Sequence, residues 1–468
     1  MNEEDICFAP ASQLRPLIQS KQVSPVEVMQ AVLNRIERLE PQLNAFAHLE
    51  ADAAMDQARA AEAAVMRGPA AGSMLGIPVT VKDLAPVAGM PFARGSHIEA
   101  GNIPKKDAPF VERLKSAGAI VLGKTTTSEF GWKGVSQSPL TGITHNPWAH
   151  GMNAGASSAG AGAAAAAGYG PLHQGSDGAG SVRMPAHFCG IYGLKPSFGR
   201  VPLTPVQSND LTSHLGPMTR TVDDAALMME VMSGPHPLDH FSLEDPAPGF
   251  DNIGEIDLKG RKIAWSPDLG HARVDPEVAK LTREAVTAFQ DMGAHVEEVT
   301  PEWGPRGPDL IRFFWAAHEL TYRSMLPEWG DRMDPGLVAC IRSAADVSAE
   351  TYIRTRTVKM DYIGAIHRFF EGYDFLLTPA VSVAAFPADK LMPADWPQHD
   401  WDWLQWAEFS YPFNMSHNPA ASIPCGFTEA GLPVGLQIVG KRMADVAVLQ
   451  ASKAFETARP WAKKRPSL

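Results

Sequence analysis

The stretch "HQGSDGAGSVRMPAHFCGIYGLKP", residues 173–196, sets one serine, Ser181, among closely spaced glycines. Glycine reaches backbone angles that are closed to other residues and lets the chain approach other atoms closely. This composition around the Ser181 hydroxyl predicts a tight loop whose backbone amides lie close to another group. A second tract of small residues, "NAGASSAGAGAAAAAG" at 153–168, carries Ser157 and Ser158. The two tracts are therefore the first candidates for a shared site.

Helical and extended patterns alternate upstream of these tracts. Residues 24–66 are predicted to be helical, because Ser24 and Glu27 form a capping box and apolar residues then recur at helical spacing. A second, Ala-rich helix is expected over about 50–67. The run "GIPVTVKDL" that follows is β-branched and bounded by glycine and proline. It predicts a buried strand that ends near Lys82.

The alternation continues downstream to the C-terminus. "FVERLKSAGAIVLGKT" predicts a helix and then a strand at 119–122, and residues 276–299 repeat this order. Residues 201–260 are predicted to be rich in loops, with a helix near 222–234. Two strands, "AASIPCGF" and "PVGLQIVG", precede a final helix. We expect an α/β fold with a large mixed, mostly parallel twisted sheet, covered by helices on both faces, in one domain over 1–468.

Composition excludes several classes of protein. The 468 residues carry a formal net charge of −11, which disfavours nucleic-acid binding because that needs clustered Lys and Arg. The four cysteines form no CxxC pair, so a disulfide framework is excluded and a reducing compartment is favoured. The acidic start "MNEEDICFAP" is unlike a signal peptide, and no stretch reaches the roughly 18 apolar residues of a membrane span. We expect a soluble, cytoplasmic protein with no nucleic-acid or membrane partner.

Several motifs of known chemistry are missing or incomplete. "GASSAG" resembles a phosphate loop but is followed by Ala161 instead of Lys, and "GAGAAA" lacks the third glycine of a dinucleotide fingerprint. The sequence contains neither G-x-S-x-G nor S-x-x-K. His236 and His240 are four apart, but in a Gly/Pro-rich loop, and His318 has no zincin partner. We therefore expect neither a metal nor a cofactor.

The remaining strings resemble a known family. "GIPVTVKD", "GASSAGAGAAAAAG" and "GSDGAGSVRMPAHFCGIYGLKPSFGRVP" are similar to the amidase signature family, which carries a serine nucleophile in a Gly/Ser-rich tract. "VLGKTTTSEFG", "NPW", "LLTPA" and "NPAASIPCGFTEAGLPVGLQIVG" resemble the same family, in order and over nearly the whole chain. The resemblance implies the amidase signature fold and hydrolysis of C–N bonds in amides.

The same resemblance implies the catalytic residues. Ser181 matches the nucleophile, Ser157 the bridging serine on a cis peptide, and Lys82 the base. Lysine can accept a proton only when neutral, and its ordinary pKa of about 10.4 leaves it charged at pH 7. Burial at the end of an apolar strand would lower that pKa. His173 and His187 flank the site in sequence, and we interpret both as partly buried structural residues, not as bases.

The resemblance also assigns the loop around the nucleophile. Backbone N–H groups of Gly178, Ala179, Gly180 and Ser181 match an oxyanion hole. Ser176 matches a hydroxyl that supports the catalytic residues, and Asp177 and Arg183 match an ion pair that holds the loop. The sequence departs from the family where "GASSAGA" replaces "GGSSGGS", where Ala179 replaces a glycine and where Met152 replaces a common arginine. A backbone donor survives a change from Gly to Ala if φ stays negative.

The substrate is the least determined feature. We expect an N-terminal helical segment at 1–66, a catalytic core at 67–230 and a variable substrate pocket at 300–408, where seven of the eleven tryptophans lie. These tryptophans either line a cleft or only pack helices on the core. The favoured substrate is a small amide, anilide or carbamate (urethane) with an apolar or aromatic part. The alternatives are the glutaminase subunit of a tRNA-dependent amidotransferase and a non-catalytic scaffold. A homodimer is possible.

Overall fold

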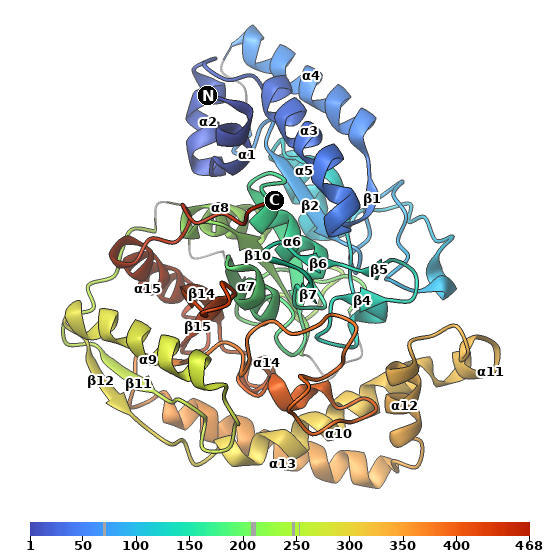
Figure 1. Cartoon of the computed structure of the whole chain (residues 1–468), viewed down its shortest axis with the longest axis vertical. Coiled ribbons are helices and arrows are strands. Elements are labelled where there is room, and N and C mark those ends of the chain that lie inside the picture. Colours follow the sequence, from blue (N-terminus) through green and yellow to red (C-terminus); the bar gives the residue numbers. More distant parts are fainter. Residues whose placement is uncertain (69–71, 207–211, 246–248, 252) are drawn as a thin grey trace.

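An 11-stranded mixed sheet organises the chain. The computed structural model describes all residues except 69–71, 207–211, 246–248 and 252 (Figure 1). The strand order is β1-β3-β2-β8-β10-β9-β14-β15-β13-β11-β12. The strands of this sheet are β1 (Phe46–Leu49), β2 (Pro78–Lys82), β3 (Ile120–Thr125), β8 (Leu172–Asp177), β9 (Tyr192–Lys195), β10 (His214–Thr219), β11 (Lys262–Trp265), β12 (His295–Glu298), β13 (Phe375–Pro379), β14 (Ala420–Phe427) and β15 (Pro433–Gly440).

Two short hairpins and the helices complete the described elements. The hairpins pair β4 (Gln137–Ser138) with β5 (Gly142–Ile143), and β6 (His145–Asn146) with β7 (Ala149–Asn153). The helices are α1 (Glu3–Phe8), α2 (Ala11–Gln19), α3 (Pro25–Leu43), α4 (Ala51–Arg67), α5 (Pro109–Ser116), α6 (Ala159–Ala167), α7 (Arg183–Cys189), α8 (Val222–Met232), α9 (Pro276–Asp291), α10 (Gly307–Glu319), α11 (Leu326–Trp329), α12 (Pro335–Ser343), α13 (Ala349–Phe369), α14 (Tyr411–Met415) and α15 (Asp445–Ala458). Short 3₁₀ turns are η1 (His97–Glu99), η2 (Glu129–Gly131), η3 (Gly304–Arg306), η4 (Leu320–Met325) and η5 (Trp403–Trp406).

The expected mixed sheet is confirmed, but the expected predominance of parallel pairs is wrong. Among the described strands, only β2–β3, β2–β8, β11–β12 and β11–β13 pair in parallel. The centre of the sheet is antiparallel, from β8 through β10, β9 and β14 to β15. Antiparallel neighbours can be joined by a short turn, as β14 and β15 are, whereas each parallel pair needs a crossover. The helix–strand alternation in the sequence therefore described the two flanks of the sheet and not its centre.

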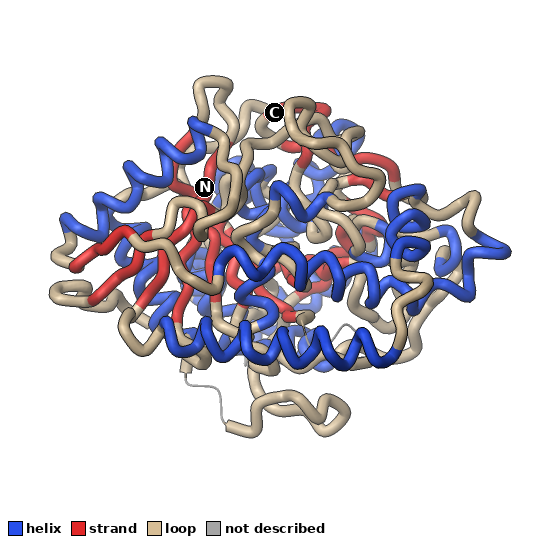
Figure 2. The backbone as a smooth tube through the Cα atoms, turned by 90° about the horizontal axis from the view of Figure 1, so that it is seen from below, coloured by secondary structure: helices blue, strands red, loops and turns tan. Residues whose placement is uncertain are grey.

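Helices cover both faces of the sheet, as expected (Figure 2). In β15, Gly435 faces His187 of α7, whereas Gly440 faces Val448 of α15. Residues at odd spacing along a strand point to opposite faces, so α7 and α15 lie on opposite sides of the sheet. A Cβ at either glycine would come within 3.4 Å of its neighbour, so both helices approach the strand closely.

The N-terminal helices follow the prediction with one interruption. Ser24 caps α3 through the predicted capping box with Glu27. The helix ends at Asn44, whose left-handed backbone (φ 52°) turns the chain into β1. This four-residue edge strand pairs only with β3 and was not predicted, because four residues show no clear period. The second predicted helix is α4.

The region 201–260 contains a strand that the sequence did not reveal. β10 lies inside the predicted loop-rich segment and pairs with β8 along its whole length. Its sequence, "HLGPMT", holds a glycine and a proline, which usually mark loops. The predicted helix near 222–234 is α8, and the predicted C-terminal strands are β14 and β15. Residues 207–211, 246–248 and 252 of this region lie outside the described residues.

Two apolar cores share the molecule. One packs the N-terminal helices, α8, α9 and α15 on the sheet, and the other surrounds α10, α12, α13 and the segment 380–415. Helix α6 is buried along its entire length, and its Ala and Gly residues let the neighbouring backbone approach it. None of the described helices has the length and hydropathy needed to cross a membrane.

Candidate active site

Lys82 is the buried centre of a group of hydroxyls. It is the last residue of β2, which lies between β3 and β8, and its side chain is inaccessible to solvent. Its Nζ lies 2.7 Å from Ser157 Oγ, 2.9 Å from Ser158 Oγ and 3.0 Å from Ser176 Oγ. The structure therefore brings the predicted lysine together with both serines of the second tract and with Ser176.

Burial shifts the Lys82 amine toward its neutral form. The pKa of Lys82 lies well below 10.5, because burial disfavours the ammonium and the Coulomb attraction of Asp177 only partly opposes this. Among the described residues, no carboxylate forms an ion pair with Lys82. A buried amine surrounded by hydroxyls can accept a proton from one of them.

Ser157 is held at the start of the buried helix α6. The Ala156–Ser157 peptide bond is cis, as the resemblance implies. The Ala156 N–H donates to the carbonyl of Gly134 at 3.0 Å. Gly131 lies so close that a Cβ there would come within 3.2 Å of Ser157 Oγ. These contacts fix the position of the Ser157 hydroxyl beside Lys82.

Ser181 follows β8 and precedes α7. Its carbonyl accepts a hydrogen bond from the Ser158 N–H at 3.3 Å, which ties the two serine tracts together. Within the described residues, no hydrogen bond joins the Ser181 and Ser157 hydroxyls, although both line one pocket of about 420 Å³. Hydrogen bonds between catalytic groups are often loose without substrate, so this arrangement is compatible with proton transfer between them.

The loop before Ser181 presents a set of backbone donors. The N–H groups of Gly178, Ala179 and Ser181 have no acceptor among the described residues. The Gly180 N–H, in contrast, donates to Asp177 Oδ1 at 2.7 Å. Of the four N–H groups that the resemblance assigns to an oxyanion hole, the Gly180 N–H is therefore already bound to Asp177, whereas the other three have no described acceptor. Ala179 does not adopt positive φ, so its methyl group leaves the direction of its N–H unaffected.

Asp177 and Arg183 form the predicted ion pair. Arg183 Nη2 lies 2.8 Å from Asp177 Oδ1, and both side chains are fully buried. Burial alone would raise the pKa of Asp177, but the Arg183 guanidinium outweighs it and holds that pKa well below its usual range. Arg183 also donates to Asn414 Oδ1 at 2.5 Å and to Gln437 Oε1 at 2.7 Å. Asn414 and Gln437 were not predicted, since nothing in the sequence links them to the loop.

Neither flanking histidine reaches the pocket. His173 Nδ1 lies 2.9 Å from Thr80 Oγ1, and His187 Nδ1 accepts from the Gly435 N–H at 2.9 Å. Burial lowers the pKa of His173 to about 3 and that of His187 to about 4. Both are fully buried, where partial burial was expected, and both are bound to structural partners.

Comparison with known proteins assigns the chain to a family. Residues 27–449 match the amidase family model. The chain belongs to the amidase family. The acylamidase of Rhodococcus erythropolis is 37% identical over 476 residues, covering 100% of this chain and 99% of that protein. A glutamyl-tRNA(Gln) amidotransferase subunit of Moorella thermoacetica is 32% identical and covers 99% of each chain.

Solved structures agree with this assignment. A bacterial aryl acylamidase of the amidase signature family superposes with a TM-score of 0.90 at 29% identity, covering 97% of each chain. A 6-aminohexanoate cyclic dimer hydrolase superposes with a TM-score of 0.89 at 28% identity, covering 98% of this chain and 99% of that one. This amidase is an amidohydrolase that acts on non-peptide C–N bonds.

The pocket of this amidase has an apolar wall and a polar end. Phe130 and Tyr322 stack with ring centroids 4.3 Å apart, and Trp315 and Met325 line the same space. The polar residues in the same lining include Arg94 and Glu319. Of the seven tryptophans in 300–408, Trp315 alone lines the described pocket. Trp303, Trp403 and Trp406 are buried in the second core, so most of this region packs helices.

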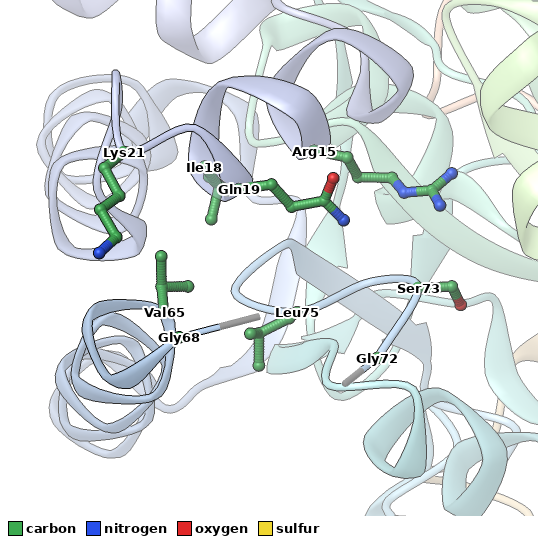
Figure 3. Close-up of a pocket in the computed structure, with 9 residues that line it drawn as sticks. All are labelled: Arg15, Ile18, Gln19, Lys21, Val65, Gly68, Gly72, Ser73 and Leu75. Carbon is green, nitrogen blue, oxygen red and sulfur yellow. The ribbon is translucent and has the colours of Figure 1, made fainter. Parts of the chain in front are cut away.

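A second pocket lies between α2 and α4 and shares no lining residue with the pocket at Ser181 (Figure 3). Arg15, Gln19 and Lys21 approach it from the N-terminal helices, and Ser73 and Leu75 face it from the segment before β2. Residues 69–71, which lie between Gly68 and Gly72 in the sequence, are outside the described part of the chain. The described lining of this second pocket holds no pairing of a nucleophile with a base.

Proposed function

We propose that this amidase hydrolyses the C–N bond of a small amide, anilide or carbamate with an apolar or aromatic part, through an acyl-enzyme on Ser181. The observation that carries the proposal is the Lys82 amine, buried without an ion-pair partner among the described residues and 2.7 Å from the Ser157 hydroxyl at the pocket floor. A serine hydroxyl becomes a useful nucleophile only when a neighbour accepts its proton.

The first half of the reaction forms the acyl-enzyme. Ser181 Oγ attacks the carbonyl carbon while its proton passes to Ser157 Oγ, whose own proton passes to Lys82 Nζ. The negative charge on the substrate oxygen is met by the N–H groups of Gly178, Ala179 and Ser181. The reverse transfer delivers the proton to the leaving nitrogen, the C–N bond breaks, and the amine departs.

The second half regenerates the enzyme. Water loses a proton along the same relay and attacks the acyl carbonyl, forming a new C–O bond. The bond to Ser181 Oγ then breaks, and the relay returns the proton to that oxygen. A carbamate would follow the same course because its carbonyl passes through the same kind of tetrahedral intermediate. An ester should be accepted as well, since alkoxide leaves more readily than amide.

The pocket wall favours an apolar or aromatic part in the substrate. Phe130, Tyr322 and Trp315 can pack against a ring, and aromatic pairs contribute about 0.5–1.5 kcal/mol beyond burial of their area. Two relatives, an acylamidase and an aryl acylamidase, support this choice.

A glutaminase subunit is the second candidate function. It is favoured by the amidotransferase subunits of about the same length that are 31–33% identical to this chain. Free glutamine is wholly aliphatic, so it has no ring to pack against the aromatic wall formed by Phe130, Tyr322 and Trp315. We therefore rank this role below that of an independent amidase.

The test is hydrolysis of four substrates by the wild type, Ser181→Ala and Lys82→Ala. The panel holds an aliphatic amide, a nitroanilide, an aryl carbamate and glutamine. We expect the wild type to prefer the nitroanilide or the carbamate, and both variants to lose that activity. Preference for glutamine would move the assignment to the glutaminase. Activity that survives in Ser181→Ala would refute the mechanism.

A further inference from the structure

The polar end of the Ser181 pocket is built on one face of α10. Trp315 and Glu319 are four residues apart in this helix and both line the pocket. Trp315 lies beside Gly178 of the donor loop, because a Cβ at Gly178 would be 4.0 Å from the Trp315 ring. Glu319 is one helical turn farther on, which places it about 6 Å along the helix axis. If an aromatic ring of the substrate packs against Trp315, a substituent on the side of that ring away from Gly178 would lie near Glu319.

Glu319 is a buried carboxyl with Arg94 nearby. Its residue is only 8% exposed, and its oxygens make no hydrogen bond or ion pair with any described residue. Burial raises the pKa of Glu319 to about 8, and the nearby Arg94 opposes this only in part. At neutral pH the group is therefore largely a protonated carboxyl, which can donate one hydrogen bond into the pocket.

Arg94 is held in place by contacts on several sides. Its backbone N–H donates to Asp83 Oδ2 at 2.8 Å, and its carbonyl accepts from the Phe130 N–H at 2.8 Å. Its Nη2 donates to Tyr322 Oη at 2.9 Å, and its guanidinium lies 4.8 Å from the centre of the Phe130 ring. The other guanidinium N–H groups have no described acceptor. The Arg94 guanidinium group is therefore fixed in position, and most of its N–H groups are available to bind a ligand in the pocket.

The backbone supports a functional role for this end of the pocket. Arg94 and Phe130 both adopt left-handed backbone angles, with φ of 54° and 51°. Residues other than glycine adopt this region uncommonly, and such residues cluster at binding and catalytic sites. Both line the pocket, so the unusual backbone serves to present these two side chains there.

We propose that Arg94 and Glu319 form a subsite for a carboxylate carried by the substrate at the end remote from the scissile bond. This inference rests on the proposed function, since the subsite lies in the pocket of Ser181. The Arg94 guanidinium pairs with the carboxylate, and the protonated Glu319 donates to it. The substrate class is then an aryl amide, anilide or carbamate that bears a remote carboxylate.

The charge balance favours an anion over a cation. A fixed guanidinium beside a neutral carboxyl gives this end a net positive charge, which repels an ammonium group. Two titratable neighbours of Glu319, Tyr322 and Cys340, are held in their neutral forms. Burial raises the pKa of the Tyr322 phenol to about 12 and also raises that of the Cys340 thiol, on α12. His318 precedes Glu319 on the same helix and lines the same pocket.

The subsite has a pH dependence with a defined sign. As pH rises through about 8, Glu319 loses its proton and becomes an anion that repels the substrate carboxylate. The KM for a carboxylate-bearing substrate therefore rises between pH 7 and pH 9, whereas the KM for a neutral analogue does not.

The test uses benzanilides that carry a para carboxylate, methyl or trimethylammonium group on either ring. We expect the wild type at pH 7 to prefer the carboxylate over the methyl compound by about tenfold or more in kcat/KM, in at least one of the two series. Arg94→Gln should remove the preference, and Arg94→Lys should restore part of it. Glu319→Gln should keep the preference, because an amide still donates, but should abolish the rise of KM between pH 7 and pH 9.

The methyl compound separates the possible failures. If the wild type hydrolyses it and shows no carboxylate preference in either series, or prefers the ammonium, the subsite proposal is overturned. If the wild type hydrolyses none of the compounds, the proposed function fails. In that case calorimetric binding of the same compounds to Ser181→Ala still tests the subsite, since binding needs no turnover. Equal binding of all three would overturn it.

Discussion

At the scale of single residues, the proposed chemistry depends on Lys82. Three hydroxyls lie within 3.0 Å of its Nζ, and burial favours its neutral form. The sequence predicted this lysine, Ser157, Ser176 and Ser181 through family resemblance, because each stands in a recognisable string. Arg94 and Glu319 stand in no such string, and only folding brings residues this far apart in the chain to one pocket.

Replacement of Lys82 by Met should reduce kcat by about 10²–10⁴-fold, the usual contribution of general acid–base catalysis. Lys82→Arg should be equally inactive, since guanidinium stays protonated and cannot accept a proton. Steady-state kinetics on a nitroanilide would measure both effects, and near-UV circular dichroism would check that each variant is folded. Substantial activity in Lys82→Arg would contradict the role of Lys82 as a base.

The buried amine of Lys82 should also make the free energy of unfolding depend on pH. The pKa of Lys82 is lower in the folded protein than in the unfolded chain. At neutral pH the unfolded chain therefore binds one more proton than the folded protein, and this proton binding stabilises the unfolded state. The free energy of unfolding of the wild type should therefore increase relative to that of Lys82→Met as pH rises from 7 toward 10.5. Urea unfolding of both proteins at several pH values would measure this. A difference that does not change with pH would show that Lys82 is charged in the fold.

At the scale of structural elements, the loop from Asp177 to Ser181 is fixed by the C-terminal half of the chain. The Ser410 hydroxyl donates to the Ala179 carbonyl at 2.6 Å, and Asn414 Nδ2 donates to Asp177 Oδ1 at 2.8 Å. The sequence predicted the Asp177–Arg183 pair but not these anchors, because single Ser and Asn residues carry no local signal. Strand β1 was missed because four residues show no clear period, and β10 was missed because it contains a glycine and a proline, which usually mark loops.

Arg183→Met should destabilise the fold by about 3–5 kcal/mol, because it leaves Asp177 buried without its partner. Arg59→Met is the matched control, since Arg59 pairs with Asp56 at the surface with both side chains mostly exposed. Urea unfolding should show a large decrease in the free energy of unfolding for Arg183→Met and no measurable change for Arg59→Met. Equal losses would contradict the structural role assigned to the buried pair.

Gly180 should tolerate no side chain. It has φ of 115°, and a Cβ there would overlap the Ser410 side chain. Gly89 shares a positive φ of 83° but has open space around it, so Gly89→Ala isolates the backbone cost of about 1–2 kcal/mol. Gly180→Ala should lose more stability than Gly89→Ala in urea unfolding, and should also lose activity. Full activity in Gly180→Ala would show that the loop is less constrained than its contacts indicate.

At the scale of the whole molecule, the sheet brings the site together. β2 and β8 are neighbours, so Lys82 at the end of one lies beside Ser176 near the end of the other. The sequence predicted an α/β fold with a mixed sheet, but it overestimated the parallel pairs. Pairing between distant strands depends on tertiary packing and leaves little trace in local patterns.

The amidase should be active without a partner protein, because Lys82, Ser157 and Ser181 all come from one chain. The purified chain should hydrolyse a nitroanilide at a rate that does not change with added cell extract. Size-exclusion chromatography of a tagged chain from its host would show whether another protein travels with it. A stoichiometric partner that is required for activity would favour the glutaminase role.

The central claim is that Ser181 is a nucleophile activated through Ser157 and Lys82. It is tested most directly by intact-mass analysis after treatment with a fluorophosphonate, followed by peptide mapping. The account predicts one adduct per chain, on Ser181, that is absent in Ser181→Ala and forms far more slowly in Lys82→Ala. An adduct on another residue, or labelling that persists in Ser181→Ala, would contradict it.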